Sequence, residues 1–160
     1  MNERSQVVPE HFRTSLARLL ADIETWARHQ ELEVSRCQVT LNEEVYGQYE
    51  ADKLCLHDSS GKIIAEVVPV AASVIGAKGR VDMVGALDQV ILVDLDAGGP
   101  AITTTVVVNG QRESRTKPLY RGIQDAGWYW IESHKLSRGR KLDEALFFDL
   151  LAEVSDHEYH

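Results

Sequence analysis

Segments of strand length follow one another through the middle of the chain, and no segment with helical spacing separates them. Alternating or continuous apolar residues mark each segment, and Gly, Asn, Asp, Ser and Pro lie between the segments. Parallel neighbours need long crossover connections, usually helices, so this order predicts an antiparallel sheet. We expect strands in the segments 37–41, 53–57, 63–70, 80–84, 89–95, 102–108, 111–116 and 128–132.

Some of these segments carry further positional signals. Asn109 and Gly110 both accept the positive φ of a type I′ turn, which predicts a two-residue hairpin. The return strand 111–116 is polar and charged, so we expect it to be an exposed edge of the sheet. The apolar run 90–93 has no alternation and predicts a central strand covered on both faces. Pro69 lacks an N–H, which predicts that its strand ends there or lies at an edge.

Two helices are predicted near the ends of the chain. Apolar residues at spacings of three and four predict one helix from Glu10 to His29 and another from Asp143 to Val154. Asp143 and Glu144 lie favourably near the positive N-terminal end of the second helix. The predicted fold class is α+β: an antiparallel, meander-like sheet of about six to eight strands, with an N-terminal and a C-terminal helix packed on it.

Length and composition set the broad class. A chain of 160 residues with 44% hydrophobic and 26% charged residues fits one globular domain over 1–160, and we expect flexible ends at 1–6 and 155–160. The apolar runs have strand length, short of the ~20 residues of a membrane helix. The first residues lack a signal-peptide pattern, and Cys37 and Cys55 alone make no disulfide framework. These features favour the cytoplasm.

The charge of the chain is unevenly distributed. The net charge is −8, yet residues 112–141 hold eight basic and three acidic side chains, and residues 142–160 hold six acidic side chains and no Lys or Arg. Overall acidity argues against a general nucleic-acid binder and favours a protein partner with a basic surface. The acidic stretch 153–158 is one candidate surface for it. The basic segment 112–141 keeps a local site for an anion open.

Three acidic residues are candidate metal ligands. Asp82 and Asp94 lie on successive predicted strands and Asp96 follows, so pairing of the strands could bring the carboxylates together. Grouped carboxylates are the hard ligands that Mg²⁺ or Mn²⁺ prefers. The spacing Asp-x(11)-Asp-x-Asp resembles the PD-(D/E)XK nuclease pattern over about 15 residues, with Asp96 at the position of the pattern's Lys. The resemblance implies metal-dependent hydrolysis. Alternatively, the three residues end strands and face water.

An aromatic and basic segment supplies the candidate binding residues, which are Trp128, Trp130, Arg138, Arg140 and Lys141. Aromatic rings can stack on bases while cations meet phosphates, and the same residue types anchor protein interfaces. Two tryptophans on one face of a strand also fit a core position. Nucleic acid, a protein partner and a structural role are therefore all open for this segment.

Motifs that would identify a reaction are missing from the sequence. The loop 76–80 does not have Walker spacing, there is no G-x-S-x-G elbow, and Cys55-x-His57 supplies only two of the four zinc ligands. This favours a binding protein over an enzyme. The first hypothesis is a small acidic module that binds a macromolecular partner, as immunity proteins, antitoxins and secretion chaperones do. The alternatives are a metal-dependent hydrolase or nuclease and a nucleic-acid binder acting through 112–141.

Overall fold

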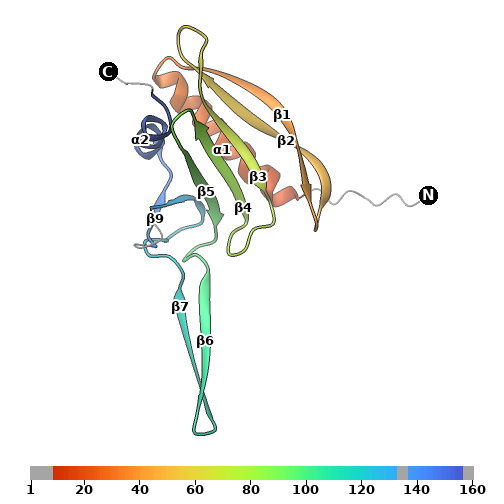
Figure 1. Cartoon of the computed structure of the whole chain (residues 1–160), viewed down its shortest axis with the longest axis vertical. Coiled ribbons are helices and arrows are strands. Elements are labelled where there is room, and N and C mark those ends of the chain that lie inside the picture. The colour runs from red at the N-terminus through yellow and green to blue at the C-terminus, as the bar shows by residue number, and fades with distance from the viewer. Residues whose placement is uncertain (1–8, 133–136, 157–160) are drawn as a thin grey trace, which may run out of the picture.

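The computed structural model describes residues 9–132 and 137–156, and these form an α+β fold (Figure 1). Helix α1 (Glu10–His29) and helix α2 (Glu144–Val154) flank the strands, as the apolar spacing predicts. In the described residues the strands are β1 (Glu33–Glu43), β2 (Gly47–His57), β3 (Ile63–Ala71), β4 (Gly79–Gly85), β5 (Gln89–Leu95), β6 (Ala101–Val108), β7 (Gln111–Pro118), β8 (Gly127–Ile131) and β9 (Gly139–Lys141). None of the described helices has the length and apolar character to cross a membrane.

Seven strands form one antiparallel sheet in the order β1-β2-β3-β4-β5-β8-β9. The first five are a meander, in which each strand pairs with the next along the chain. The prediction for Pro69 is wrong, because β3 continues to Ala71 and lies between β2 and β4. Pro69 is tolerated there because it lies beyond the last β2–β3 pair, Leu54 with Val67, and at a register shift in the β3–β4 ladder. Strand β9 is too short for its sequence pattern to reveal it.

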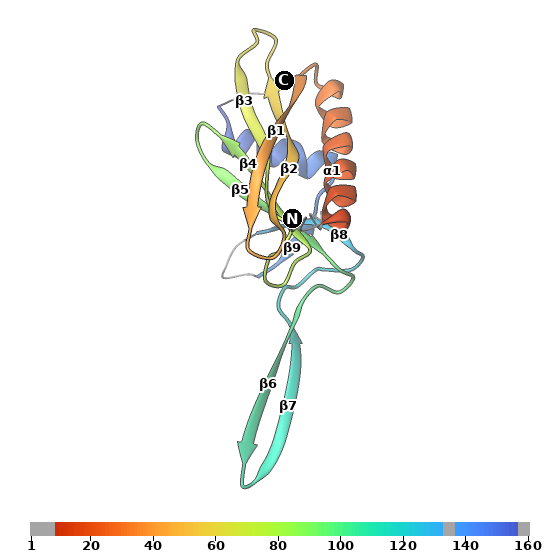
Figure 2. The ribbon, with the colours of Figure 1, turned by 90° about the vertical axis from the view of Figure 1, so that its right-hand side faces the viewer.

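The main core lies between the sheet and the two helices (Figure 2). The apolar stripe of α1 is buried, and α2 packs beside it, with the rings of Trp26 and Phe147 5.7 Å apart. Asp143 caps α2, because its side chain accepts a hydrogen bond of 2.8 Å from the Leu146 amide. Both helices therefore cover the same face of the sheet.

The opposite face of the sheet is only partly covered. Val93 and Tyr129 form a small second core there, with Ile123 from the segment before β8 packed against them. Ile91, which lies on the same face of β5 as Val93, is 41% exposed. The prediction that 90–93 is covered on both faces is therefore wrong at Ile91, because the loop covers only one end of the strand.

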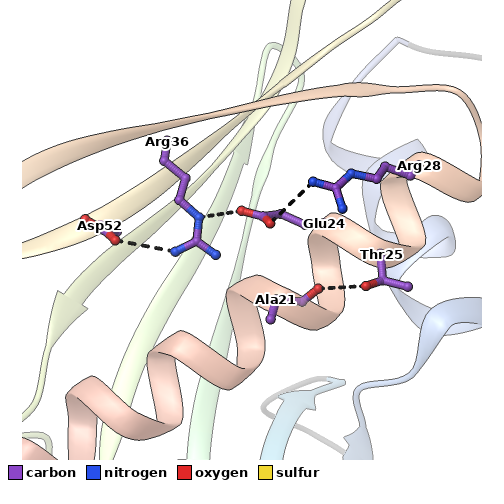
Figure 3. A network of polar contacts seen from close by, with 6 residues as sticks. All are labelled: Ala21, Glu24, Thr25, Arg28, Arg36 and Asp52. Carbon is purple, nitrogen blue, oxygen red and sulfur yellow. Dashed lines mark hydrogen bonds and ion pairs between the residues drawn. The ribbon is translucent and has the colours of Figure 1, made fainter.

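A polar network fastens α1 to the edge of the sheet (Figure 3). The Arg36 guanidinium of β1 lies between Glu24 of α1, to which it donates, and Asp52 of β2, 3.4 Å away. The hydrogen bond with Glu24 raises the pKa of Arg36. Arg28 adds a second cation 3.8 Å from Glu24, one turn along the helix. The network holds the helix over β1 and β2.

The hairpin of β6 and β7 does not belong to the main sheet. The two strands form a separate two-stranded sheet that projects from one end of the molecule, as both views show (Figures 1 and 2). Asn109 and Gly110 have φ of 51° and 77°, as a type I′ turn requires. The turn is thereby confirmed, and 111–116 is an exposed edge strand as expected, although in this separate hairpin and not in the main sheet. We call residues 101–118 the arm.

Candidate functional site

The three candidate carboxylates, Asp82, Asp94 and Asp96, do not lie together in the structure. In the β4–β5 ladder, Gly79 pairs with Asp94 and Asp82 pairs with Ile91. Because side chains alternate along a strand, Asp82 and Asp94 lie on opposite faces of the sheet. Asp96 follows the end of β5. The structure therefore does not bring the three together, and no group of three or more His, Cys, Asp or Glu side chains in the described part of the chain is placed to hold a metal ion.

Two of these carboxylates are paired with nearby cations. Asp82 is buried, and Nε and Nη2 of Arg80 donate to its two oxygens at 2.8 and 3.0 Å. This pairing raises the pKa of Arg80, chiefly through the hydrogen bond. Asp96 is exposed and lies 2.9 Å from Nζ of Lys78. Both arrangements are those of structural ion pairs.

Asp94 is a buried anchor for α1. It is 3% exposed and accepts a hydrogen bond of 2.7 Å from the Ser15 hydroxyl, while Nε2 of His11 lies 3.3 Å away. The backbone carbonyl of Ser15 accepts a bond of 3.2 Å from the Trp128 indole. Both the serine and the histidine contact the same carboxylate oxygen, so the three do not form a serine–histidine–aspartate relay.

The tryptophans and the cations of the basic segment have separate roles. Trp128 is 8% exposed, and Trp130 packs against the main core. Arg138, Arg140 and Lys141 are exposed, and Arg140 lies opposite Trp130 in the β8–β9 ladder. Residues 133–136 of the same segment lie outside the described residues, as do 157 and 158 of the acidic stretch. The tryptophan faces are thus turned to the core, where they offer little surface for stacking.

The other candidate groups do not converge on one site. His57 contacts the Ser35 hydroxyl at 3.0 Å, and the Cys55 thiol lies 3.7 Å from Glu66. The glycine loop 76–80 connects to β4 and lines a shallow depression with Asp96 and residues 99–100. A groove of about 290 Å³ between α1 and β2 is edged by residues of the Arg36 network. These features give no constellation for a particular reaction.

The arm is the most unusual surface of the molecule. Every one of its residues is exposed, and its aliphatic side chains are Ile102 at 52%, Val106 at 49%, Val107 at 62% and Val108 at 53% exposed. Apolar side chains gathered in this way mark interaction sites more often than isolated ones do. An isolated two-stranded hairpin is also marginally stable in water.

The two faces of the arm differ in chemistry. On one face, hydroxyl groups pair across the strands: Thr103 with Thr116 at 2.9 Å and Thr105 with Ser114 at 3.1 Å. The other face carries aliphatic residues of β6 opposite polar and charged residues of β7, in the pairs Ile102 with Lys117, Val106 with Glu113 and Val108 with Gln111. The first face also holds Val107 opposite Arg112, and the second holds Thr104 opposite Arg115. The clearer division is therefore between an uncharged β6 and a polar, charged β7.

The base of the arm is fixed to the rest of the described structure, which we call the body. The Leu119 amide donates to the Pro100 carbonyl at 2.8 Å, and the Gly98 amide donates to the Gln124 carbonyl at 2.8 Å. Gly99 has φ of 73° and lies against Ile123, where a Cβ would be 3.2 Å from a side-chain carbon. The arm thus leaves the body at a defined point, next to the small second core.

Sequence reasoning predicted this hairpin but not its projection. The available signal was β7, whose sequence Gln-Arg-Glu-Ser-Arg-Thr-Lys-Pro offers no large apolar residue to a core. Without such a residue, β7 would bury no large apolar side chain by packing against the helices. The hairpin of β6 and β7 therefore lies outside the main sheet. Likeness to other proteins adds nothing here. The chain matches no family model, no curated protein and no solved structure.

Proposed function

We propose that the protein is a protein-interaction module whose arm is the binding element. The observation that supports this most is the exposure of about half or more of Ile102, Val106, Val107 and Val108 on a hairpin that stands clear of the core. Covering these side chains would contribute roughly 25 cal/mol for each Å² of apolar surface removed from water. A macromolecular partner can supply that cover.

A protein partner fits the arm better than a nucleic acid does. The arm carries Arg112, Arg115 and Lys117 against Glu113, so its charge is modest, and the rest of the chain is acidic. Strand β6 has no charged residue at all, whereas binding to phosphates depends on cations. The prediction of a partner with a basic surface concerns the acidic body and stays a prediction.

Site-directed photo-crosslinking in native lysate tests this function. A photoreactive residue replaces Val106 in the arm, and a matched control carries it at Glu153, an exposed position on α2. We expect one dominant protein adduct from position 106, identified by mass spectrometry and insensitive to nuclease treatment. A pattern equal to that of the control, or an adduct that nuclease removes, would rule out the arm as a protein-binding element.

A further inference from the structure

Strand edges differ in how they are protected from pairing with another chain. In the described structure, β1 and β9 are the edges of the main sheet, and β6 and β7 each have one free edge in the arm. Charged side chains on an edge discourage further pairing. Three of these strands carry them: Glu33, Arg36 and Glu43 on β1, Arg140 and Lys141 on β9, and Arg112, Glu113, Arg115 and Lys117 on β7. Strand β6 carries none.

The backbone of β6 is also free to pair. Val108 and Gln111 flank the two-residue turn and close it by hydrogen bonding, so amides of the even-numbered residues of β6 face β7. The N–H and C=O groups of the four odd-numbered residues 101, 103, 105 and 107 then point to the free edge. Since β6 consists almost entirely of Thr, Val and Ile, its residues also have high strand propensity.

We propose that β6 pairs antiparallel with β6 of a second copy of this chain, about a two-fold axis at Thr104. This inference rests on the proposed function, because it names the partner of the arm. The order of residues supports it. About Thr104, Thr103 meets Thr105 of the second copy, Ile102 meets its Val106, and Ala101 meets its Val107. Each hydroxyl residue meets a hydroxyl residue and each aliphatic residue meets an aliphatic one, so the strand is self-complementary in this register.

The same register satisfies the backbone. Residue 103 pairs with 105 and residue 101 with 107, and all four belong to the set whose N–H and C=O groups point outward. The two copies of Thr104 then form a non-hydrogen-bonded pair on the axis, where Cα atoms approach to roughly 4.5 Å. An axis shifted by half a residue would pair outward amides with inward ones and lose these bonds.

In this register, the side chains that lie in a row across one arm line up with those of the second arm on both faces of the sheet. The hydroxyl pair of Thr116 and Thr103 extends to Thr105 and Ser114 of the second copy, which are themselves paired. On the other face, Val106 lies beside Ile102 of the second copy, and the row ends at Glu113 on one side and at Lys117 of the second copy on the other. The product is a four-stranded sheet, which is more stable than an isolated hairpin.

The charge of the molecule agrees with this arrangement. Antiparallel pairing places the two acidic bodies at opposite ends of the joined arms, because each arm points away from its own body (Figure 2). Eight strand residues span roughly 27 Å, several times the Debye length of about 8 Å at physiological ionic strength. Repulsion between the bodies is therefore screened, and solution mass should be that of a dimer.

Charge reversal on the axis tests the pairing. The variants T104E and T104K each oppose like charges in a homodimer, so we expect sedimentation to show a dissociation constant raised by about fivefold or more in each. An equal mixture of the two should form a heterodimer at least as tight as the wild type. T116E and T116K on β7 are matched controls, because β6 lies between Thr116 and the second copy. Equal thermal melting of all four variants at low protein concentration, where the arms are unpaired, would confirm that each is folded.

Cysteine trapping tests the register independently. In a C37S background, which removes the exposed native thiol, T104C should form an intermolecular disulfide under mild oxidation, seen on a non-reducing gel. T116C is the control and should remain mostly monomeric. Trapping of T104C at several times the yield of T116C supports the two-fold axis at Thr104.

The outcomes separate this inference from the proposed function. A monomer at all concentrations, together with equal trapping of T104C and T116C, would overturn self-pairing. If position 106 still crosslinks to a different protein in lysate, the proposed function stands and the arm has a heterologous partner. If position 106 crosslinks to no protein and the chain is monomeric, both proposals fail. A crosslink of position 106 to another copy of this chain supports both.

Discussion

At the scale of single residues, the two thiols have contrasting environments. Cys37 is exposed on β1, whereas Cys55 on β2 is buried, and burial followed by the nearby Glu66 carboxylate raises its pKa. The thiolate is the reactive form, so we expect a thiol reagent at pH 7.5 to modify Cys37 at least about tenfold faster than Cys55. Absorbance during reaction with a disulfide reagent will show the two phases. C37S should remove the fast phase; its removal by C55S instead would contradict this assignment.

A second residue-scale prediction concerns the exposed pair of Lys141 and Asp125. The hydrogen bond from Lys141 lowers the pKa of Asp125 below its ordinary value of 3.8. A lowered pKa means that the pair contributes at neutral pH and that its contribution is lost as pH falls through the folded-state value. Carbon-detected NMR titration should place Asp125 below 3.8 in the wild type and move it upward in K141M. An unchanged midpoint in K141M would show that the pair does not form in solution.

At the scale of elements, the position of α1 depends on a buried polar contact. Ser15 donates to the buried Asp94, whereas the Thr25 hydroxyl bonds within the helix to the Ala21 carbonyl and faces solvent. Removing the donor leaves a buried carboxylate short of a partner, so S15A should lower the free energy of unfolding by about 1–3 kcal/mol. T25A, which also removes a hydroxyl, should change it by less than about 0.5 kcal/mol. Urea denaturation measures both, and equal effects would contradict the anchoring role of Ser15.

The second prediction for an element concerns the close contact between Gly85 of β4 and Val154 at the end of α2. A Cβ at Gly85 would lie 2.6 Å from the Val154 carbonyl carbon and closer still to its oxygen, which also accepts the Leu87 amide at 2.9 Å. G85A should therefore destabilise the protein by several kcal/mol, because backbone must move apart. Gly61 has open space around it and φ of 86°, so G61A should cost about 1 kcal/mol through its backbone conformation alone. Chemical denaturation of the two variants should show this order, and the reverse order would contradict it.

The sequence predicts an element well where the interactions that determine it lie within one short segment, and poorly where they join distant segments. The helix over 10–29 follows from the spacing of Phe12, Leu16 and Ile23, and the type I′ turn follows from Asn109 and Gly110, because both are properties of a short segment. The opposite faces of Asp82 and Asp94 depend on the register between two strands, and a shift of one residue would reverse them. Ile91 is exposed because a distant loop stops short of it. Contacts between segments that are distant in the sequence cannot be predicted from the residue pattern of one segment.

At the scale of the whole molecule, the body and the arm are separate structures joined at one point. The body has its core between two helices and seven strands, whereas the arm adds no buried residue to either core cluster. Changes in the arm should then have little effect on the folding of the body. Strand β6, which has no charged residue, thus lies apart from the acidic body.

This separation leads to a prediction about a shortened chain, in which Asn-Gly replaces residues 101–118. Pro100 and Leu119 are already joined by a hydrogen bond of 2.8 Å, so a two-residue turn can close the gap. At low protein concentration, we expect calorimetry to show melting temperatures of the shortened and full chains within about 2 °C of each other, because no core contact is lost. As concentration rises, only the full chain should melt higher, since pairing of arms stabilises the folded state by mass action. A shortened chain that melts well below the full chain at every concentration would show instead that the arm is part of the cooperative fold.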